Sequence, residues 1–351
     1  MSKVCYLNLA TYSTVGGIEN YNKSFLEALD SLQEDVLSIS VYDKASKDEF
    51  NNIEFKNFEG KKIRASICVF RNIYKTKKLI IAHANLLSLG ILAKIFNPKI
   101  KIYLCIYGVE VWKKLPFIYR IFVRHICVLS ISSHTTDLFQ KYNKLSNDNI
   151  YYLPPFIKIE AENNFRNIYD EKRFNILSVS RLDSVDNYKG IDSMINTIPF
   201  LIKKIPNLKY TIVGQGDDKD RLEDIVRVLG LENYVEFKGF VEPIEPYYKY
   251  CDVFALPSKG EGFGIVFIEA MKYHKPCIAC DEGGQIDIVI NNRTGLLCKY
   301  DDLFCLSEKI SQLYLDKSLR MTLGLNGYNH VTKNYTLETY KEKLKFLLDE
   351  T

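Results

Sequence analysis

The chain has 351 residues, 47% of them hydrophobic and 26% charged, with a formal net charge of +4. This length allows two domains that each bury a core, and the composition excludes a disordered, collagenous or low-complexity protein. The first ten residues are too short and too weakly charged for a signal peptide. The most apolar stretch, residues 79–96, is interrupted by polar residues. We therefore expect a cytoplasmic protein without a membrane span.

Nine cysteines lie mostly inside apolar runs, and their number is odd. This pattern favours reduced, buried thiols in a reducing compartment. Cys277 and Cys280 have the spacing of a redox or zinc motif, but they follow Pro276 in a strand-like run and no second such motif accompanies them. We interpret this pair as structural.

In chain order, an apolar strand at 3–10 is followed by the turn Gly16-Gly17 and a helix from about 18 to 32. The glycine pair would bring the backbone to the carboxyl edge of the sheet, where open α/β folds bind ligands. Further strands are expected at 36–42, 67–70, 79–83, 101–106 and 128–132, and helices at about 86–96, 115–125 and 134–141. Strands that alternate with helices indicate a parallel sheet covered on both faces.

Residues 61–125 contain fourteen Lys or Arg and one acid, Glu110. Such a one-sided charge suits an anionic partner. Nucleic acid is one candidate, but no nucleic-acid motif accompanies the charge. Residues 113–124 mix basic with large apolar side chains at helical spacing, which favours an anionic membrane surface. The alternative is a solvated basic face on an ordinary core helix.

Pro154 and Pro155 close the first half, and the polar residues 158–173 are predicted to be a linker. A second series of strands is expected at 174–180, 209–214, 235–239, 253–256 and 275–280. Helices are expected between and after these strands, at about 190–204, 218–229, 244–250, 264–273 and 285–291. The chain is thus predicted to form two α/β domains facing each other across a cleft, with an amphipathic helix at 335–348.

Three loops of the second half carry residues that suit a phosphorylated ligand. Arg181 and Lys189 present two cations after the first strand and could neutralise a departing diphosphate. Residues 259–270 form a glycine-rich loop that enters a helix, with Glu261 and Glu269 eight residues apart. A carboxylate there can accept paired hydrogen bonds from a sugar diol. Gly283 and Gly284 precede a further helix start.

The remaining signals are weaker. Gly214 belongs to a strand-and-glycine turn, and Gly239-Phe240 ends a strand that could meet a base through main-chain groups. Asp218 and Asp220 have the DxD form that binds Mg²⁺ in some sugar transferases. Acids in a first helical turn are favoured by the helix dipole alone, so we expect no metal.

These motifs, in this order and spacing, resemble the nucleotide-binding half of the retaining glycosyltransferase family often called family 4. The resemblance covers about residues 174–300, through SRLDSVDNYKGID, VGQGDDKDRL, VEFKGFV, ALPSKGEGFGIVFIEAM and CDEGGQIDIVINNRTGLL. It implies a GT-B fold, two Rossmann-like domains with the donor in the second, and metal-independent catalysis. It also implies that Arg181 and Lys189 bind the diphosphate and Glu269 the ribose. Glu261, with the backbone of Gly262, Phe263, Gly264 and Ile265, would hold the transferred sugar.

The first half resembles the family more loosely, through Gly16-Gly17-Ile18-Glu19 and through 106–112. Many members have a histidine beside the anomeric centre of the sugar where this chain has Tyr107, which offers a hydroxyl but no imidazole. Gly108 and Glu110 adjoin it. His83 is a possible substitute, with a buried structural histidine as the alternative. We expect these four residues on the acceptor or sugar side.

The resemblance implies four segments: an acceptor-binding domain at 1–157, the linker at 158–173, a donor-binding domain at 174–325, and a helical segment at 326–351 that packs back toward the first domain. The predicted function is transfer of a sugar from a nucleoside-diphosphate sugar to a glycan acceptor, which we expect to be lipid-linked. The setting would be assembly of a surface polysaccharide such as a capsule, at the inner face of the cell membrane. A GT-B sugar epimerase and a non-catalytic nucleotide-sugar-binding scaffold remain as alternatives.

Overall fold

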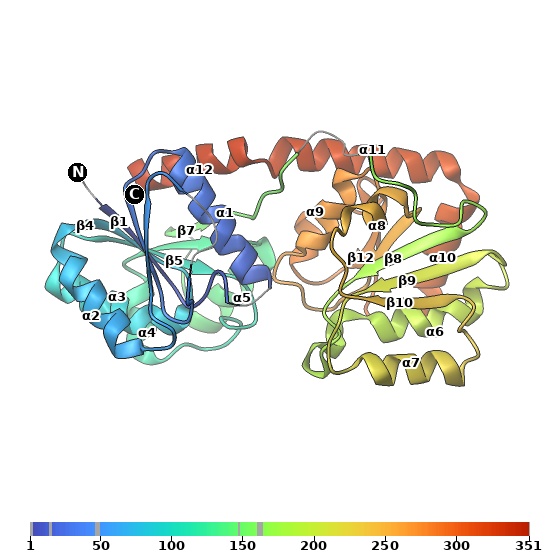
Figure 1. The fold of residues 1–351 in the computed structure, drawn as a ribbon, viewed down its shortest axis with the longest axis horizontal. Helices are drawn as coiled ribbons and strands as arrows, with labels where there is room; N and C mark the ends of the chain where they lie inside the picture. Colours follow the sequence, from blue (N-terminus) through green and yellow to red (C-terminus); the bar gives the residue numbers. More distant parts are fainter. Residues whose placement is uncertain (1–2, 14–15, 46–49, 147, 160–163, 351) are drawn as a thin grey trace. The chain divides into compact units, whose positions relative to one another are not determined.

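The computed structural model describes residues 3–13, 16–45, 50–146, 148–159 and 164–350. These residues form two compact units (Figure 1). The first unit comprises residues 1–156 and 337–351, and the second comprises residues 157–336. Residues 160–163 of the predicted linker lie outside the described residues, and the linker residues from 164 onward belong to the second unit.

The first unit is built on a seven-stranded parallel sheet of order β3-β2-β1-β4-β5-β6-β7. Its central strands are almost continuously buried, as expected for strands covered on both faces. The strands are β1 (Lys3–Asn8), β2 (Val36–Ser40), β3 (Ile53–Asn57), β4 (Thr76–Ile81), β5 (Lys101–Ile106), β6 (Cys127–Ser130) and β7 (Ile150–Tyr152). The helices are α1 (Gly17–Ser31), α2 (Lys62–Asn72), α3 (Leu87–Phe96), α4 (Phe117–Val123), α5 (Ser133–Asn143) and α12 (Leu337–Glu350), with short 3₁₀ turns η1 (Ile73–Lys75) and η2 (Ala84–Leu86).

The second unit is built on a six-stranded parallel sheet of order β10-β9-β8-β11-β12-β13. The strands are β8 (Phe174–Val179), β9 (Leu208–Val213), β10 (Val235–Gly239), β11 (Val253–Leu256), β12 (Cys277–Cys280) and β13 (Gly295–Cys298). The helices are α6 (Ile191–Leu201), α7 (Lys219–Val228), α8 (Glu245–Tyr250), α9 (Ile265–Lys272), α10 (Leu303–Leu315) and α11 (Lys317–Asn334), with 3₁₀ turns η3 (Ser184–Lys189) and η4 (Gly284–Asp287). The predicted α/β class with two Rossmann-like sheets is confirmed.

The last helix, α12, packs against α1 in the first unit (Figure 1). The Tyr340 hydroxyl on α12 donates to the Tyr21 hydroxyl on α1 at 3.1 Å, and their rings meet edge to face. The Tyr103 hydroxyl donates to the Leu347 carbonyl at 3.3 Å. The preceding helix, α11, contacts α9 and belongs to the second unit. The chain therefore returns to the first unit at residue 337, eleven residues after the predicted start of the terminal segment.

The predicted strand at 67–70 is wrong, because these residues lie in helix α2. The apolar run 67–70 suggested a strand, but Ala65, Val69 and Ile73 lie four residues apart and form the buried stripe of a helix and its following turn. Strands β3 and β13 were not predicted. The expected helix at 285–291 is only the 3₁₀ turn η4. Within the described part of the chain, no helix is both long enough and apolar enough to cross a bilayer.

Candidate functional site

The loops that follow β8, β9, β10, β11 and β12 lie at one edge of the second sheet, since all its strands are parallel. This is the carboxyl edge, where open α/β sheets bind ligands. The order of the strands reverses direction between β8 and β11. The loops after these two strands carry the predicted residues Lys189 and Glu261, so these two residues stand at the topological switch point of the sheet.

Lys189 and Glu261 form a mostly buried ion pair. The Lys189 Nζ atom lies 2.9 Å from Oε1 and 3.0 Å from Oε2 of Glu261, and the two side chains are 16% and 12% exposed. The Ser258 hydroxyl donates to Glu261 Oε1 at 2.9 Å. Burial opposes the charge on Lys189, but the carboxylate of Glu261 outweighs it, so the pKa of the lysine is raised. The ammonium group is therefore held charged and fixed in direction.

Gly190 allows the loop that carries Lys189 to pack closely against the loop that carries Glu261. Its φ is +75°, and a Cβ atom built on it would lie 2.4 Å from the carbonyl oxygen of Pro257. The Lys259 amide also donates to the Tyr188 carbonyl at 2.8 Å. A side chain at position 190 would separate the loop of Lys189 from the loop of Glu261, which explains why glycine occupies the junction between η3 and α6.

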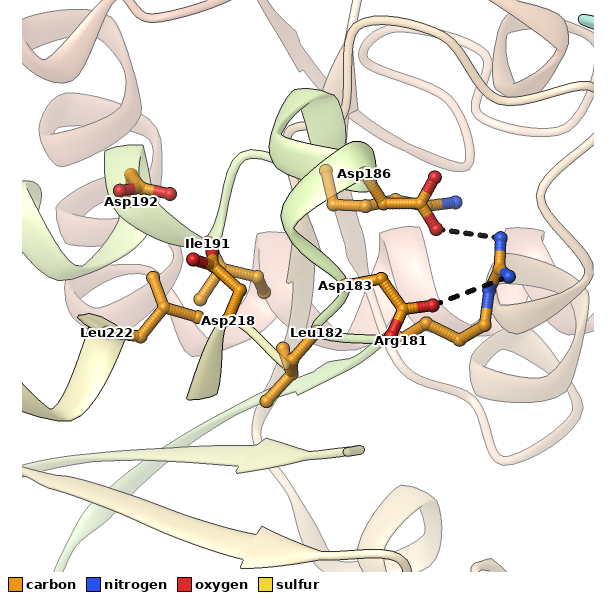
Figure 2. A pocket seen from close by; sticks show the side chains of 9 residues that line it. Arg181, Leu182, Asp183, Asp186, Ile191, Asp192, Asp218 and Leu222 are labelled. Carbon is orange, nitrogen blue, oxygen red and sulfur yellow. Dashed lines mark ion pairs between the residues drawn. The ribbon is translucent and has the colours of Figure 1, made fainter. Parts of the chain in front are cut away.

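Arg181 lies at the edge of a small pocket (Figure 2), and its side chain is 61% exposed. Its guanidinium is 2.7 Å from Asp186 and 3.6 Å from Asp183. The pocket is lined by Arg181, Leu182, Asp183, Asp186, Lys189, Ile191, Asp192, Asp218 and Leu222. Because four of these residues are aspartates, the pocket itself is a poor site for an anion. An anionic ligand would instead contact the exposed side of Arg181.

The predicted DxD motif is explained by an ion pair. Arg221 donates to both oxygens of Asp218 at 2.6 Å and to both oxygens of Asp192 at 2.6 and 3.0 Å. Asp220 lies in the first turn of α7, where an acid suits the helix dipole. In the part of the chain that the structure describes, no cluster of three or more His, Cys, Asp or Glu is arranged to hold a metal ion.

Glu269 lies in α9, which begins just after Gly264. One of its oxygens accepts a hydrogen bond from the Tyr248 hydroxyl at 2.7 Å. Burial raises the pKa of Glu269, and the hydrogen bond from Tyr248 opposes that shift. Glu269 as a whole residue is of intermediate burial and lies in the second turn of α9. Tyr248 on α8 was not predicted from the sequence, because the pattern gives no sign of a contact across 21 residues.

The loop that follows β12, which contains Gly283 and Gly284, packs against the glycine-rich loop that contains Glu261 and Gly262. The Gly284 amide donates to the Glu261 carbonyl at 2.7 Å, and a Cβ atom on Gly284 would lie 2.1 Å from the Gly262 carbonyl oxygen. Gln285 is fully buried, and its amide nitrogen donates to the Ser258 carbonyl at 2.7 Å. Gln285 and Ser258 were missed by sequence reasoning. A polar amide directly after a glycine pair in an apolar region was the available signal.

Several predicted donor-site residues have side chains or Cα positions that pack against neighbouring loops. The Phe263 side chain is buried against Tyr335, so only its main chain is available. A Cβ on Gly214 would lie 1.7 Å from the Ser180 carbonyl oxygen, so this glycine permits close packing of two loops. Gly239 accepts from the Gly214 amide at 2.9 Å. Phe240, by contrast, is an exposed aromatic side chain at the same edge.

The predicted residues of the first unit engage one another or the local backbone. The Tyr107 hydroxyl is buried and donates to the Asn22 side chain at 3.3 Å, and burial raises its pKa well above the ordinary value. The Glu110 carboxylate accepts from the amides of Tyr107 at 2.6 Å and Gly108 at 3.1 Å. His83 Nδ1 accepts from the Asn85 amide at 3.1 Å, and burial lowers the pKa of this histidine. Tyr107 is thus buried in the core of the first unit, and the acceptor- or sugar-side role of residues 107–110 stays a prediction.

Gly16 and Gly17 start α1. A Cβ on Gly16 would approach Glu19 Oε2 at 2.6 Å, whereas one on Gly17 would meet no atom within 4 Å. The atom near Gly16 is the end of the flexible Glu19 side chain, so neither position requires glycine for close packing against the backbone.

Two Rossmann-like parallel sheets and a return of the last helix to the first unit define the GT-B fold. The crystal structure of Anabaena Alr3699/HepE in complex with UDP superposes with a TM-score of 0.82 over 99% of this chain and 100% of that one, at 17% identity, a likeness that concerns the fold. Residues 160–330 match the family described as Glycosyl transferases group 1.

Two curated glycosyltransferases are similar to this chain in sequence. The capsular polysaccharide biosynthesis glycosyltransferase CapM of Staphylococcus aureus is 30% identical over 196 residues, which cover 54% of this chain and 50% of CapM. The match thus spans about half of that relative's length. The uncharacterized glycosyltransferase MJ1178 of Methanocaldococcus jannaschii is 26% identical over 340 residues, covering 90% of each chain. The resemblance inferred from the sequence motifs is confirmed.

Proposed function

We propose that this protein is a retaining glycosyltransferase that transfers a sugar from a nucleoside-diphosphate sugar to a glycan acceptor. The observation that carries the proposal is the buried pair of Lys189 and Glu261 at the switch point of the second sheet. HepE, which has the same fold, was crystallised in complex with UDP, and this supports a nucleotide as the ligand of this chain. The match to CapM supports a role in surface polysaccharide assembly.

In the proposed reaction, the bond between the sugar and the diphosphate breaks and negative charge develops on the departing oxygen. The Lys189 ammonium is held charged, and Arg181 presents an exposed guanidinium on the neighbouring loop. These two cations neutralise the leaving group without a metal. The anomeric configuration is retained if the acceptor attacks from the face that the diphosphate leaves. Such a reaction depends mainly on stabilisation of the leaving group. Glu261 orients Lys189 and contacts the transferred sugar.

Glu269 is assigned to the ribose of the donor. Its ionised carboxylate can accept hydrogen bonds from both ribose hydroxyls. In the protonated acid, one oxygen carries a hydrogen and acts as a donor instead. Replacing Glu269 with glutamine should weaken nucleotide binding by about 1.5–3 kcal/mol, which is about 10- to 150-fold in the dissociation constant. Calorimetric titration with the preferred nucleoside diphosphate measures this change, and an unchanged dissociation constant would exclude the ribose role.

Nucleotide affinity should also depend on pH through Glu269. Burial raises the pKa of this carboxyl group, so lowering the pH protonates it sooner than an exposed glutamate, and affinity should fall. The hydrogen bond from Tyr248 opposes that shift, so Tyr248→Phe should move the loss of affinity to higher pH. Nucleotide titrations over a pH series test whether affinity is lost at higher pH in Tyr248→Phe than in the wild type. Glu269→Gln is the control, because it has no carboxyl group at this position to protonate.

The reaction type is tested by product analysis. Wild-type protein given donor and acceptor should yield a glycoside with the anomeric configuration of the donor, detectable by NMR, and a chelator should leave the rate unchanged. Inversion at the anomeric carbon would overturn the retaining assignment. A changed sugar in donor-only incubations identifies an epimerase instead. Tight nucleotide binding without turnover across a donor and acceptor panel identifies a scaffold subunit.

The acceptor is proposed to be lipid-linked because one face of the first unit suits an anionic bilayer. Helices α2, α3 and α4 contact one another in sequence (Figure 1). They expose large apolar side chains, among them Ile63, Ile95, Phe96, Phe117 and Ile118. The segment 61–125 that contains these helices has fourteen Lys or Arg against one acid, and the carboxylate of that acid, Glu110, is engaged by backbone amides. Apolar and basic side chains on one surface are the combination that binds an anionic membrane interface.

Vesicle sedimentation tests this face. Wild-type protein should bind vesicles containing phosphatidylglycerol and not vesicles of phosphatidylcholine alone. Changing Lys113 and Lys114 together to glutamate removes two cations, each contributing about 1 kcal/mol near an anionic surface, so binding should weaken at least 30-fold. Val228→Ser, on an exposed site of α7 in the second unit, is the matched control. Equal binding to both vesicle types would contradict the membrane proposal.

A further inference from the structure

Two cysteines of the second unit have their sulfur atoms in contact. Cys298 ends β13 and is 2% exposed, whereas Cys305 lies in the first turn of α10 and is partly exposed. Their Sγ atoms are 3.0 Å apart. A movement of about 1 Å would bring them to the S–S bond length of about 2.05 Å. Both are free thiols in this structure.

Cys298 and the residues that follow it contact helix α6 and two loops of the candidate site. The Asp281 amide, at the start of the loop of Gly283 and Gly284, donates to the Cys298 carbonyl at 2.9 Å. Asp301 accepts from the Ser193 hydroxyl at 2.8 Å, in the first turn of α6. The Lys259 ammonium lies 5.6 Å from the centre of the Tyr300 ring. Residues 298–301 therefore contact helix α6 and the loops that follow β11 and β12.

We propose that Cys298 and Cys305 are a modification site that forms a reversible intramolecular disulfide with a small disulfide oxidant of the oxidised-glutathione class. The thiolate of Cys305 attacks one sulfur of the oxidant, forms a mixed disulfide and expels one thiolate. The Cys298 thiolate then attacks the Cys305 sulfur and expels the second. Two protein thiols are oxidised, one oxidant disulfide is reduced to two thiols, and the two cysteine protons pass to the expelled thiolates.

The order of the two attacks follows from the surroundings of each sulfur. Cys305 is the more accessible thiol and meets the oxidant first. Burial, followed by the contact with Cys305, raises the pKa of Cys298 well above its ordinary value, so this thiol is the poorer first nucleophile of the two. The product fixes residues 299–304 between β13 and α10.

Peptide mapping tests the bond directly, because Lys299 lies between the two cysteines. The folded protein is treated with oxidised glutathione, alkylated and digested with trypsin without reduction. The peptides 294–299 and 300–309 should then appear joined, with the summed mass less two hydrogens, and separate after reduction. Cys280→Ser should still give the joined pair, and Cys305→Ser should not. Glutathione remaining on Cys305 as a mixed disulfide, or no modification of either cysteine, would overturn the proposal.

The effect on the loops is measured by amide hydrogen exchange on the same samples. Exchange of residues 299–304 should slow on oxidation of the wild type and stay unchanged in Cys305→Ser. An oxidised wild type whose exchange in 299–304 matches the reduced form would overturn the fixing of this segment. We also expect oxidation to alter nucleotide affinity, and this expectation rests on the proposed function. It is measured by comparing the nucleotide dissociation constants of the oxidised and the reduced protein. Failure of the proposed function would leave the mapping and exchange results intact.

Discussion

Replacing Lys189 with methionine is expected to lower sugar transfer by about 100- to 1,000-fold, the range for loss of one charge-stabilising donor in an active site. The same change should reduce the free energy of unfolding of the second unit by about 3–5 kcal/mol, because it leaves the Glu261 carboxylate buried without its cation. Steady-state kinetics on protein shown to be folded, together with denaturant unfolding, measures both effects.

The double variant Lys189→Met, Glu261→Gln separates these two effects. It removes the unpaired charge, so most of the lost stability should return, while transfer should remain low because no ammonium faces the leaving group. Recovery of both stability and transfer would show that Lys189 serves only to neutralise Glu261. A single variant with near-normal transfer would contradict the assignment of Lys189 to the leaving group.

Gly284→Ala is expected to have the second-largest effect. Its new methyl group would lie 2.1 Å from the Gly262 carbonyl oxygen and 2.9 Å from the Phe263 Cα atom, both of them backbone atoms. The loop after β12 must therefore move away from the glycine-rich loop, breaking the hydrogen bond from the Gly284 amide to the Glu261 carbonyl. Stability should fall by about 1–3 kcal/mol, and nucleotide affinity should fall with it.

Unfolding in denaturant and calorimetric nucleotide titration check the Gly284 prediction. Gly17→Ala is the control, because a methyl group there meets no atom within 4 Å and the position starts a helix. That variant should keep or slightly raise stability, since alanine favours a helix by up to about 1 kcal/mol relative to glycine. A Gly284→Ala protein as stable and as tight-binding as the wild type would contradict the close contact of the two loops.

The sequence predicted the architecture because each strand, glycine turn and helix start is a local pattern. Arg181, Lys189, Glu261 and Gly283 each follow a strand of one parallel sheet, so their shared edge could be deduced before any contact was known. The failure at 67–70 arose where one apolar run fits either a strand or a helix, and tertiary burial of one stripe decided the outcome.

The supporting contacts of the site could not be predicted, because they join residues far apart in the chain. Tyr248 reaches Glu269 across 21 residues, and Gln285 reaches Ser258 across 27. Tyr107 shows a second limit. Its position in a motif was visible in the sequence. The direction of its side chain depends on contacts with Tyr21 and Asn22 of α1, and Tyr21 in turn packs against Tyr340 of α12, more than 200 residues away.

Nucleotide binding to the wild-type chain tests the account most directly. A thermal and chemical unfolding panel with nucleoside diphosphates and their sugars should identify at least one ligand that stabilises the protein. At 100 times its dissociation constant, such a ligand adds about 2.7 kcal/mol to the free energy of unfolding. The gain should be strongly reduced in Lys189→Met and in Glu269→Gln. No stabilisation by any nucleotide, or equal stabilisation of all three proteins, would contradict a donor site at this edge of the sheet.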